Sequence, residues 1–279
     1  MKYFLILATI AVYIFVAQSD GYSYTAQDQW PGICVTGNSG RQSPIDIITR
    51  EAERNVNFGS LSINVDYYYM NGTLKNTGHN VEFTPESGVN AILTTPVGDY
   101  KLKQFHFHWG AREGEGTEHL VDDGAEELEI HFVHEKVGGT NSKARDALAV
   151  LAVRGRAIHA YSGYTDIEFK MLDVSQITKV EASVDVKNLV VRNLLPYIFD
   201  YYYYEGSLTT PDCDEIVQWF VLKHTINVPA AYLKDLRKIE KDKDGNRLTF
   251  NFRDTQDLAD RTIYKYEVTF AEQPNMLPK

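Results

Sequence analysis

Short runs in which hydrophobic and polar residues alternate dominate the chain. Such alternation predicts β-strands, because successive side chains of a strand point to opposite faces of its sheet. Gly, Asn, Asp or Pro residues occupy the gaps between the runs, as expected of turns. The predicted strands are Ser62–Tyr69, Asn80–Phe83, Tyr100–Trp109, Leu128–His134, Ala147–Arg154, Ile216–Lys223 and Arg247–Phe252.

Helical spacing is found in only two stretches. Hydrophobic residues recur every three positions in 230–239, directly after Pro229, and a weaker helical pattern covers 166–176. Strands without regularly intervening helices predict a fold that is mostly β with peripheral helices (α+β). Its centre is predicted to be one large, twisted, mainly antiparallel sheet. Neither a repeat nor a low-complexity linker divides the chain, so we expect a single domain.

The N-terminus predicts export from the cell. A basic start is followed by the apolar run Phe4–Ala17 and by small residues near Ser19, which is typical of a signal peptide. The alternative is a membrane anchor or a buried helix, but the run is shorter than the roughly 20 residues that span a bilayer. We therefore expect a signal peptide at 1–19, a mature domain at 20–279 and a secreted, extracellular product without a membrane anchor.

Composition narrows the choice of partners. The chain has 28 Lys and Arg against 38 Asp and Glu, a net charge of −10, which argues against non-specific nucleic-acid binding. It has two cysteines, Cys34 and Cys213, which would close a long loop if they pair in an oxidising compartment and are otherwise unrelated buried thiols. The triplet that begins at Asn71 is a candidate glycosylation site. The sequence does not predict the oligomeric state.

Candidate chemistry is concentrated in two neighbouring predicted strands. Alternation places Gln104, His106 and His108 on one face of the first strand. It places Glu129, His131 and Val133 on one face of the second. If the strands lie side by side, three imidazoles converge, and three neutral histidines with one open position are typical of catalytic zinc. The alternative is a set of ordinary hydrogen-bonded histidines, but Gln104 and Glu129 each stand two residues before a histidine and offer the oxygen that orients a metal-bound ring.

Longer segments resemble the α-carbonic anhydrase family. QFHFHWG, TEHLVD and ELEIHFVH resemble its zinc-binding core, and YYEGSLTTPDCDEIVQW resembles its active-site threonine segment. RQSPIDI, NTGHNVEF and NFR occur in the family's order and spacing, so the resemblance covers roughly 22–253. It implies a secreted zinc enzyme that hydrates carbon dioxide reversibly to bicarbonate and a proton, by attack of zinc-bound hydroxide.

The resemblance also implies residue roles. The zinc ligands are implied to be His106, His108 and His131. The residues that orient them are implied to be Gln104, Glu129 and Asn251. The catalytic group comprises the proton shuttle His79, the hydroxyl of Thr209 and the carboxylate of Glu118 that receives that hydroxyl's proton. The implied substrate contacts are Thr210 for bicarbonate and, for carbon dioxide, Val133, Val150, Leu208 and Trp219. The positions of Cys34 and Cys213 match a pair that is disulfide-linked in secreted members.

Some positions depart from the family pattern, and other functions stay open. Thr77 and Glu82 stand where the family often has amides near the shuttle, so we expect an effect on proton transfer; Asp212 replaces a proline. The main alternative is a catalytically silent relative that serves as a binding or matrix module, although such members typically lose zinc-binding histidines. A zinc hydrolase acting on esters or peptides is less favoured, because the helical H-E-x-x-H motif is missing.

Overall fold

The computed structural model describes residues 21–36, 40–55, 57–159 and 164–268. The predicted signal peptide lies outside these ranges. Among the described residues, no helix is both long and apolar enough to cross a membrane.

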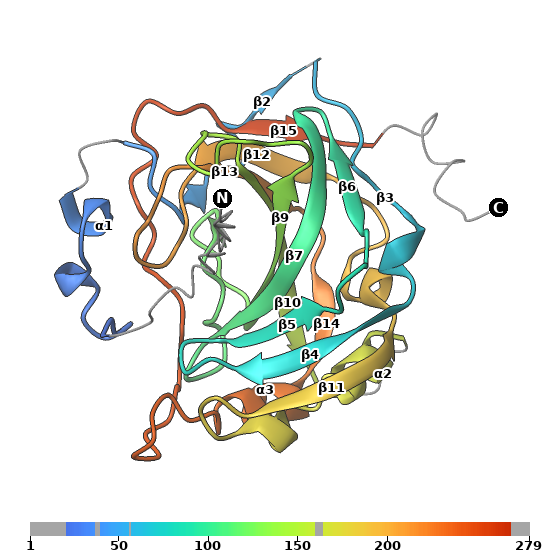
Figure 1. The fold of residues 1–279 in the computed structure, drawn as a ribbon. Coiled ribbons are helices and arrows are strands. Elements are labelled where there is room, and N and C mark those ends of the chain that lie inside the picture. Colours follow the sequence, from blue (N-terminus) through green and yellow to red (C-terminus); the bar gives the residue numbers. More distant parts are fainter. Residues whose placement is uncertain (1–20, 37–39, 56, 160–163, 269–279) are drawn as a thin grey trace, which may run out of the picture.

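A twisted sheet of 13 strands forms the body of the protein (Figure 1). Its main path runs through β11 (Ser183–Leu189), β4 (Met70–Asn76), β5 (Val81–Pro85), β7 (Gly98–Trp109), β9 (Leu128–Lys136), β10 (Leu148–Ile158), β13 (Val217–Leu222), β12 (Tyr201–Gly206), β15 (Tyr264–Tyr266) and β2 (Glu53–Arg54). The remaining strands of this sheet are β14 (Ile226–Pro229), which pairs with β10, β6 (Ile92–Thr95), which pairs with β7, and β3 (Ser62–Ile63), which pairs with β6. A separate small sheet pairs β1 (Asp46–Ile47) with β8 (Leu120–Val121).

The helices lie at the periphery of this sheet, as Figure 1 shows. The α-helices are α1 (Ile33–Thr36), α2 (Tyr164–Met171) and α3 (Ala230–Leu236). Short 3-10 turns are η1 (Gln27–Gln29), η2 (Val65–Tyr67), η3 (Val174–Ile177) and η4 (Val191–Leu194). Most strand pairs are antiparallel, while β10 runs parallel to β13 and β14. The predicted fold class, mostly β with a large and mainly antiparallel sheet, is confirmed.

The two faces of the central strands carry different residues. One face packs into the larger hydrophobic core, to which β7, β9 and β10 contribute Phe105, Phe107, Ile130, Phe132, Leu151 and Val153. The opposite face carries His106 and His108 of β7 and His131 of β9. It continues over β10, β12 and β13 into a second apolar cluster that includes Val150, Ala152, Tyr204, Trp219 and Val221.

Two predicted strands are wrong in whole or in part. In Ser62–Tyr69 the strand ends at Ile63, and the 3-10 turn η2 follows with Tyr67 fully buried. The segment 247–252 forms no strand and makes only an isolated bridge from Arg247 to Glu240. Its side-chain and backbone groups bond to β7 instead, which strand periodicity does not reveal. The strands β4, β11 and β12 were not predicted.

A disulfide joins Cys34 to Cys213 across 179 positions of sequence. This is the pairing that the family resemblance implied. The carbonyl of Cys34 accepts a hydrogen bond from Arg253 Nη2 at 2.7 Å, and the carbonyl of Cys213 accepts one from Gln42 Nε2 at 3.2 Å. The bridge therefore ties the N-terminal segment to the loop that follows β12.

Replacing both cysteines, as Cys34→Ala/Cys213→Ala, is expected to lower the free energy of unfolding by about 3–5 kcal/mol. The physical reason is that the bridge restricts a very long loop in the unfolded chain. Urea unfolding followed by fluorescence measures the change, and wild type treated with reductant serves as the matched control. Equal midpoints for the oxidised wild type and the double variant would contradict the expectation.

Candidate metal centre

The register of β7 and β9 brings three histidines together. His106 on β7 lies directly opposite His131 on β9, and His108 lies opposite Glu129. All of these side chains occupy the face that the alternation predicted. His106, His108 and His131 each offer a ring nitrogen, and these atoms lie within 4.8 Å of one another.

Each of the three rings is oriented by an oxygen on its outer side. His106 Nδ1 donates to Gln104 Oε1 at 2.9 Å, and His131 Nε2 donates to Glu129 Oε1 at 2.7 Å. His108 Nδ1 donates to the backbone carbonyl of Asn251 at 2.7 Å. Because each outer nitrogen faces an acceptor, it carries the hydrogen, and the inner nitrogen keeps a free lone pair.

The inner nitrogens suit a tetrahedral metal ion. His108 Nε2 and His131 Nδ1 are 3.0 Å apart, close to the roughly 3.3 Å that separates two nitrogens on tetrahedral zinc with bonds of about 2.0–2.1 Å. Burial lowers the pKa of all three histidines, and neighbouring histidines lower it further for His106 and His108. The pKa of His108 falls to about 3. The rings are therefore neutral at neutral pH, as metal binding requires.

Asn251 connects the ligand strand to the turn that carries His79. Besides its carbonyl bond to His108, its side-chain Oδ1 accepts from the backbone N–H of Trp109 at 2.8 Å. Its Nδ2 donates to the carbonyls of Phe107 at 2.8 Å and of His79 at 3.2 Å. No local sequence pattern marks this role, because the group that accepts from His108 is a backbone carbonyl.

Glu129 is shared between His131 and a further histidine. Its Oε1 also accepts from His119 Nδ1 at 2.7 Å, and its Oε2 accepts from the His119 backbone N–H at 2.9 Å. Burial alone would raise the pKa of Glu129, but the interactions with His119 and His131 outweigh burial and bring it well below its usual range. Glu129 is therefore a fully buried carboxylate.

The second ring nitrogen of His119 contacts Tyr204, which belongs to a hydrogen-bond network that the sequence analysis did not predict. The Tyr204 hydroxyl lies 2.7 Å from His119 Nε2 and 2.9 Å from Ser43 Oγ. Ser43 and Ser207 each donate a backbone N–H to the other's hydroxyl at 3.0 Å. This network ends at the segment that carries Thr209, and no regular spacing of its members along the chain predicts it.

Glu118 and Thr209 lie on the same side as the histidines. Glu118 Oε1 accepts from the Arg253 backbone N–H at 2.9 Å, while its Oε2 is fully buried without a hydrogen-bond partner among the described residues. Burial raises the pKa of Glu118 well above its usual range, although the nearby Thr209 hydroxyl and the Arg253 amide oppose this. Glu118 Oε2 can therefore accept a further hydrogen bond on the side of Thr209.

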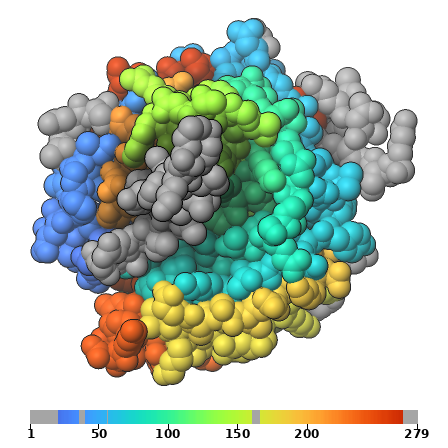
Figure 2. All heavy atoms as spheres, in the orientation of Figure 1, coloured from blue at the N-terminus to red at the C-terminus, as the bar shows by residue number. Residues whose placement is uncertain are grey.

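An apolar wall adjoins the three histidines. The predicted residues Val150 and Trp219 are buried in the second apolar cluster, and Val133 and Leu208 pack against it. The Trp219 ring lies 4.8 Å from the His131 ring, and Trp219 Nε1 donates to the Ser207 carbonyl at 3.1 Å. Thr210 follows in the same turn, where its carbonyl accepts from the Cys213 N–H at 2.8 Å. Figure 2 shows a hollow on this side of the molecule whose floor has the colours of β5 to β9.

His79 lies in the turn between β4 and β5, apart from the three-histidine group. The Tyr22 ring stacks on it with centroids 4.1 Å apart, and a cavity of about 310 Å³ opens beside both rings. The turn is held by Asn76, whose Oδ1 accepts from the Gly78 N–H at 2.8 Å. Glu82, on β5, lies opposite His106 and Lys75 in the sheet, and burial raises its pKa.

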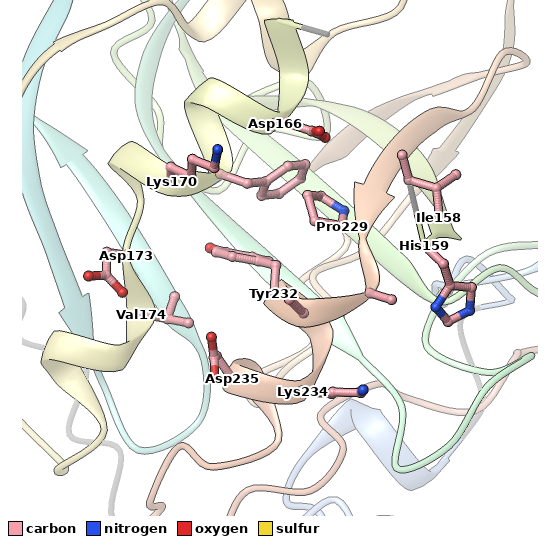
Figure 3. A pocket seen from close by; sticks show the side chains of 13 residues that line it. Ile158, His159, Asp166, Lys170, Asp173, Val174, Pro229, Tyr232, Lys234 and Asp235 are labelled. Atoms are coloured by element: carbon pink, nitrogen blue, oxygen red, sulfur yellow. The ribbon is translucent and has the colours of Figure 1, made fainter. Parts of the chain in front are cut away.

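Other candidate residues lie elsewhere. His134 contacts the Tyr67 hydroxyl on the opposite face, and exposed His224 bonds to Asp200 at 3.1 Å. Asn71 lies on β4, and its Oδ1 accepts a hydrogen bond from the Asn188 N–H at 2.9 Å. A separate cavity of about 610 Å³ lies between α2 and α3 (Figure 3). Its lining contains none of the predicted site residues.

Comparisons with known proteins agree with this arrangement. A sequence model of the eukaryotic-type carbonic anhydrases matches residues 25–267. The chain is 35% identical to carbonic anhydrase 6 of Mus musculus over 261 residues, which cover 88% of this chain and 81% of that protein. It is 33% identical to carbonic anhydrase 1 of Mus musculus over 259 residues, which cover 87% of this chain and 96% of that protein.

Metal-free protein is expected to lose stability as the pH falls from about 6.5 towards 4. Burial lowers the pKa of His134 to about 4 and that of His108 to about 3, whereas histidines of the unfolded chain take up protons near pH 6.5. Within this window the unfolded state holds more protons, so acid favours unfolding by up to about 1.4 kcal/mol per pH unit for each group. Above pH 6.5 these two groups add no further pH dependence.

Urea unfolding at a series of pH values measures this slope. His134→Gln removes one titrating group away from the metal side and should make the slope shallower. A His134→Gln slope equal to that of wild type would contradict the assignment.

Proposed function

The chain belongs to the eukaryotic-type carbonic anhydrase family, and we propose that it hydrates carbon dioxide with a zinc ion held by His106, His108 and His131. The observation that carries the proposal is the convergence of three neutral rings, each with its outer nitrogen bonded to an oxygen. Zinc bound by three histidines in carbonic anhydrases lowers the pKa of a coordinated water to about 7, which supplies hydroxide at neutral pH. The donor set fits this ion, because imidazole nitrogens with a free fourth position suit catalytic zinc.

Thr209 and Glu118 select what binds beside the metal position. The buried Oε2 of Glu118 has no hydrogen-bond partner within the described part of the chain, and an unmet buried acceptor is costly. We assign the Thr209 hydroxyl proton to this carboxyl group. The threonine oxygen then has only lone pairs left and accepts from groups that carry a hydrogen. Burial raises the pKa of Glu118, and a dication a few ångströms away would favour its ionised form.

The apolar wall is the proposed resting place of carbon dioxide. This substrate has no charge and no hydrogen to donate, so a pocket can hold it only by excluding water and matching its shape. Val133, Val150, Leu208 and Trp219 offer such a surface next to His131. We assign Thr210, whose side chain follows Thr209, to contact with the bicarbonate product.

His79 is the proposed proton carrier. Hydration releases a proton, and histidine is the side chain that titrates near neutral pH. Its place in a turn stacked on Tyr22, beside a cavity and apart from the ligands, suits a group that passes protons outward through water.

We also propose that the protein is secreted and glycosylated at Asn71. The Cys34–Cys213 disulfide supports an oxidising compartment. Within the described residues the Asn71 amide nitrogen donates a single long hydrogen bond of 3.4 Å, to Glu86 Oε2. Attachment of a glycan to this nitrogen would therefore disturb few contacts.

Measurement of zinc content and carbon dioxide hydration, on wild type and on His106→Ala, tests the enzyme assignment. We expect about one zinc per wild-type chain with rapid hydration. In His106→Ala we expect loss of most zinc and of activity by several orders of magnitude, because two histidines leave the site incomplete. His224→Ala is the matched control and should behave as wild type. Zinc-loaded wild type that is inert towards carbon dioxide would favour the silent binding module.

His79→Ala is expected to slow turnover about ten- to a hundredfold while leaving zinc content unchanged, since it removes only the proton carrier. Added imidazole should restore much of the rate at high concentration, because a small base in solution can take over the transfer. Stopped-flow turnover in weak and strong buffers measures both effects. A rate equal to that of wild type in weak buffer would remove His79 from the pathway.

A further inference from the structure

A buried arginine lies on the same face as the three histidines, one strand away from Glu129. Arg154 on β10 is paired directly with Glu129 on β9, and Glu129 is paired on its other side with His108 on β7. Arg154 is only 7% exposed and Glu129 is fully buried. His108, Glu129 and Arg154 therefore form a row across the adjacent strands β7, β9 and β10.

The local contacts of Arg154 are poor for a buried cation. Its Nη2 donates to the Lys223 carbonyl over a long 3.4 Å. Its Nε is fully buried and has no hydrogen-bond partner among the described residues. A buried charge that is not well hydrogen-bonded is costly unless an opposite charge offsets it, and local hydrogen bonding does not account for this one.

The offsetting charge comes chiefly from Glu129. Burial lowers the pKa of Arg154, and the negative charge of Glu129, followed by that of Glu126, is the main influence that raises it again. Glu126 is itself engaged by Arg156 through two hydrogen bonds at the surface. Among the described residues, the side-chain hydrogen bonds of Glu129 all go to His119 and His131, so Arg154 affects Glu129 through its charge and leaves these hydrogen bonds intact.

We propose that Arg154 tunes the metal centre: its positive charge offsets that of Glu129 and so weakens the grip of the three histidines on a dication. The sign follows from Coulomb's law, because a buried cation on this face repels the metal while Glu129 attracts it. Burial keeps the interaction from being screened by salt. Because Glu129 then neutralises less of the charge of the metal ion, the ion keeps more positive charge for chemistry. The site therefore binds the ion less tightly but makes it more reactive.

This inference rests on the proposed zinc site, and chelator competition for zinc at fixed pH tests it without an activity measurement. Arg154→Met, which keeps an unbranched apolar stem but removes the charge, should lower the zinc dissociation constant about three- to tenfold. We expect less than the 10- to 100-fold effects of residues that touch a ligand. Structural damage would change the dissociation constant in the opposite direction, because a disturbed site binds metal more weakly.

Two variants complete the design. Arg154→Lys keeps the charge and should bind zinc within about twofold of wild type. Arg156→Met is the matched control, because Arg156 lies two residues further along β10 and is solvent-exposed; it should leave zinc binding unchanged, since water screens its charge. Thermal unfolding of the metal-free proteins checks folding. Should Arg154→Met fail to fold, Arg154→Gln takes its place, since an amide can still donate to the Lys223 carbonyl.

The outcomes separate this inference from the proposed function. Wild type without measurable zinc affinity would remove the metal site itself. Wild type that binds zinc, with Arg154→Met binding equally or more weakly, would overturn the role of Arg154 alone. A lysine variant that tightens zinc as much as methionine does would also overturn it, because the charge would then not be the cause.

Discussion

The pairing of β7 with β9 determines the geometry of the whole site. Phe105 lies opposite Phe132 in this register, with ring centroids 5.1 Å apart in the main core, and His106 lies opposite His131 on the reverse face. A slip of one residue would send every side chain of a strand to the other face. It would expose the phenylalanines and bury the histidines among hydrocarbons. Aromatic packing on one face thus fixes the ligands on the other.

The same two-residue alternation extends the site over β10 and β13. Moving along β9 from Val133 to His131 to Glu129, the group on this face changes from an apolar side chain to an imidazole to a carboxylate. Each of these three residues has a cross-strand neighbour on the same face. Val133 pairs with Val150 on β10, which pairs in turn with Trp219 on β13; His131 pairs with Ala152, and Glu129 pairs with Arg154. The apolar wall, the histidine group and the outer carboxylate therefore follow from one surface pattern rather than from separately positioned loops.

The alternation of hydrophobic and polar residues predicts strands and the side chains that they carry, but it does not predict contacts made by loops or by backbone groups. The strands that carry the ligands and the side-chain tethers Gln104 and Glu129 could be predicted, because residue type and spacing both mark them. The strand predicted at 247–252 was wrong, since its alternating residues serve contacts with β7 instead of a sheet ladder. The tether of His108 is a backbone carbonyl that any residue could supply, so its position followed only from the family resemblance. Arg154 resembles an ordinary strand end until the register places it beside Glu129.

A further buried cation, Arg253, contributes both to stability and to the arrangement of the site. Arg253 donates its backbone N–H to Glu118 and its guanidinium to the carbonyls of Ser43 and Cys34, at 2.7 Å each. The disulfide then continues from Cys34 to Cys213, in the turn that begins with Thr209 and Thr210. Segments far apart in the sequence are thereby fixed around a single carboxyl group. A buried acceptor such as Glu118 can select its partner only if its surroundings do not move to solvate it. The bridge that restricts the unfolded chain thus also holds the segments of Thr209 and Glu118 in place beside each other.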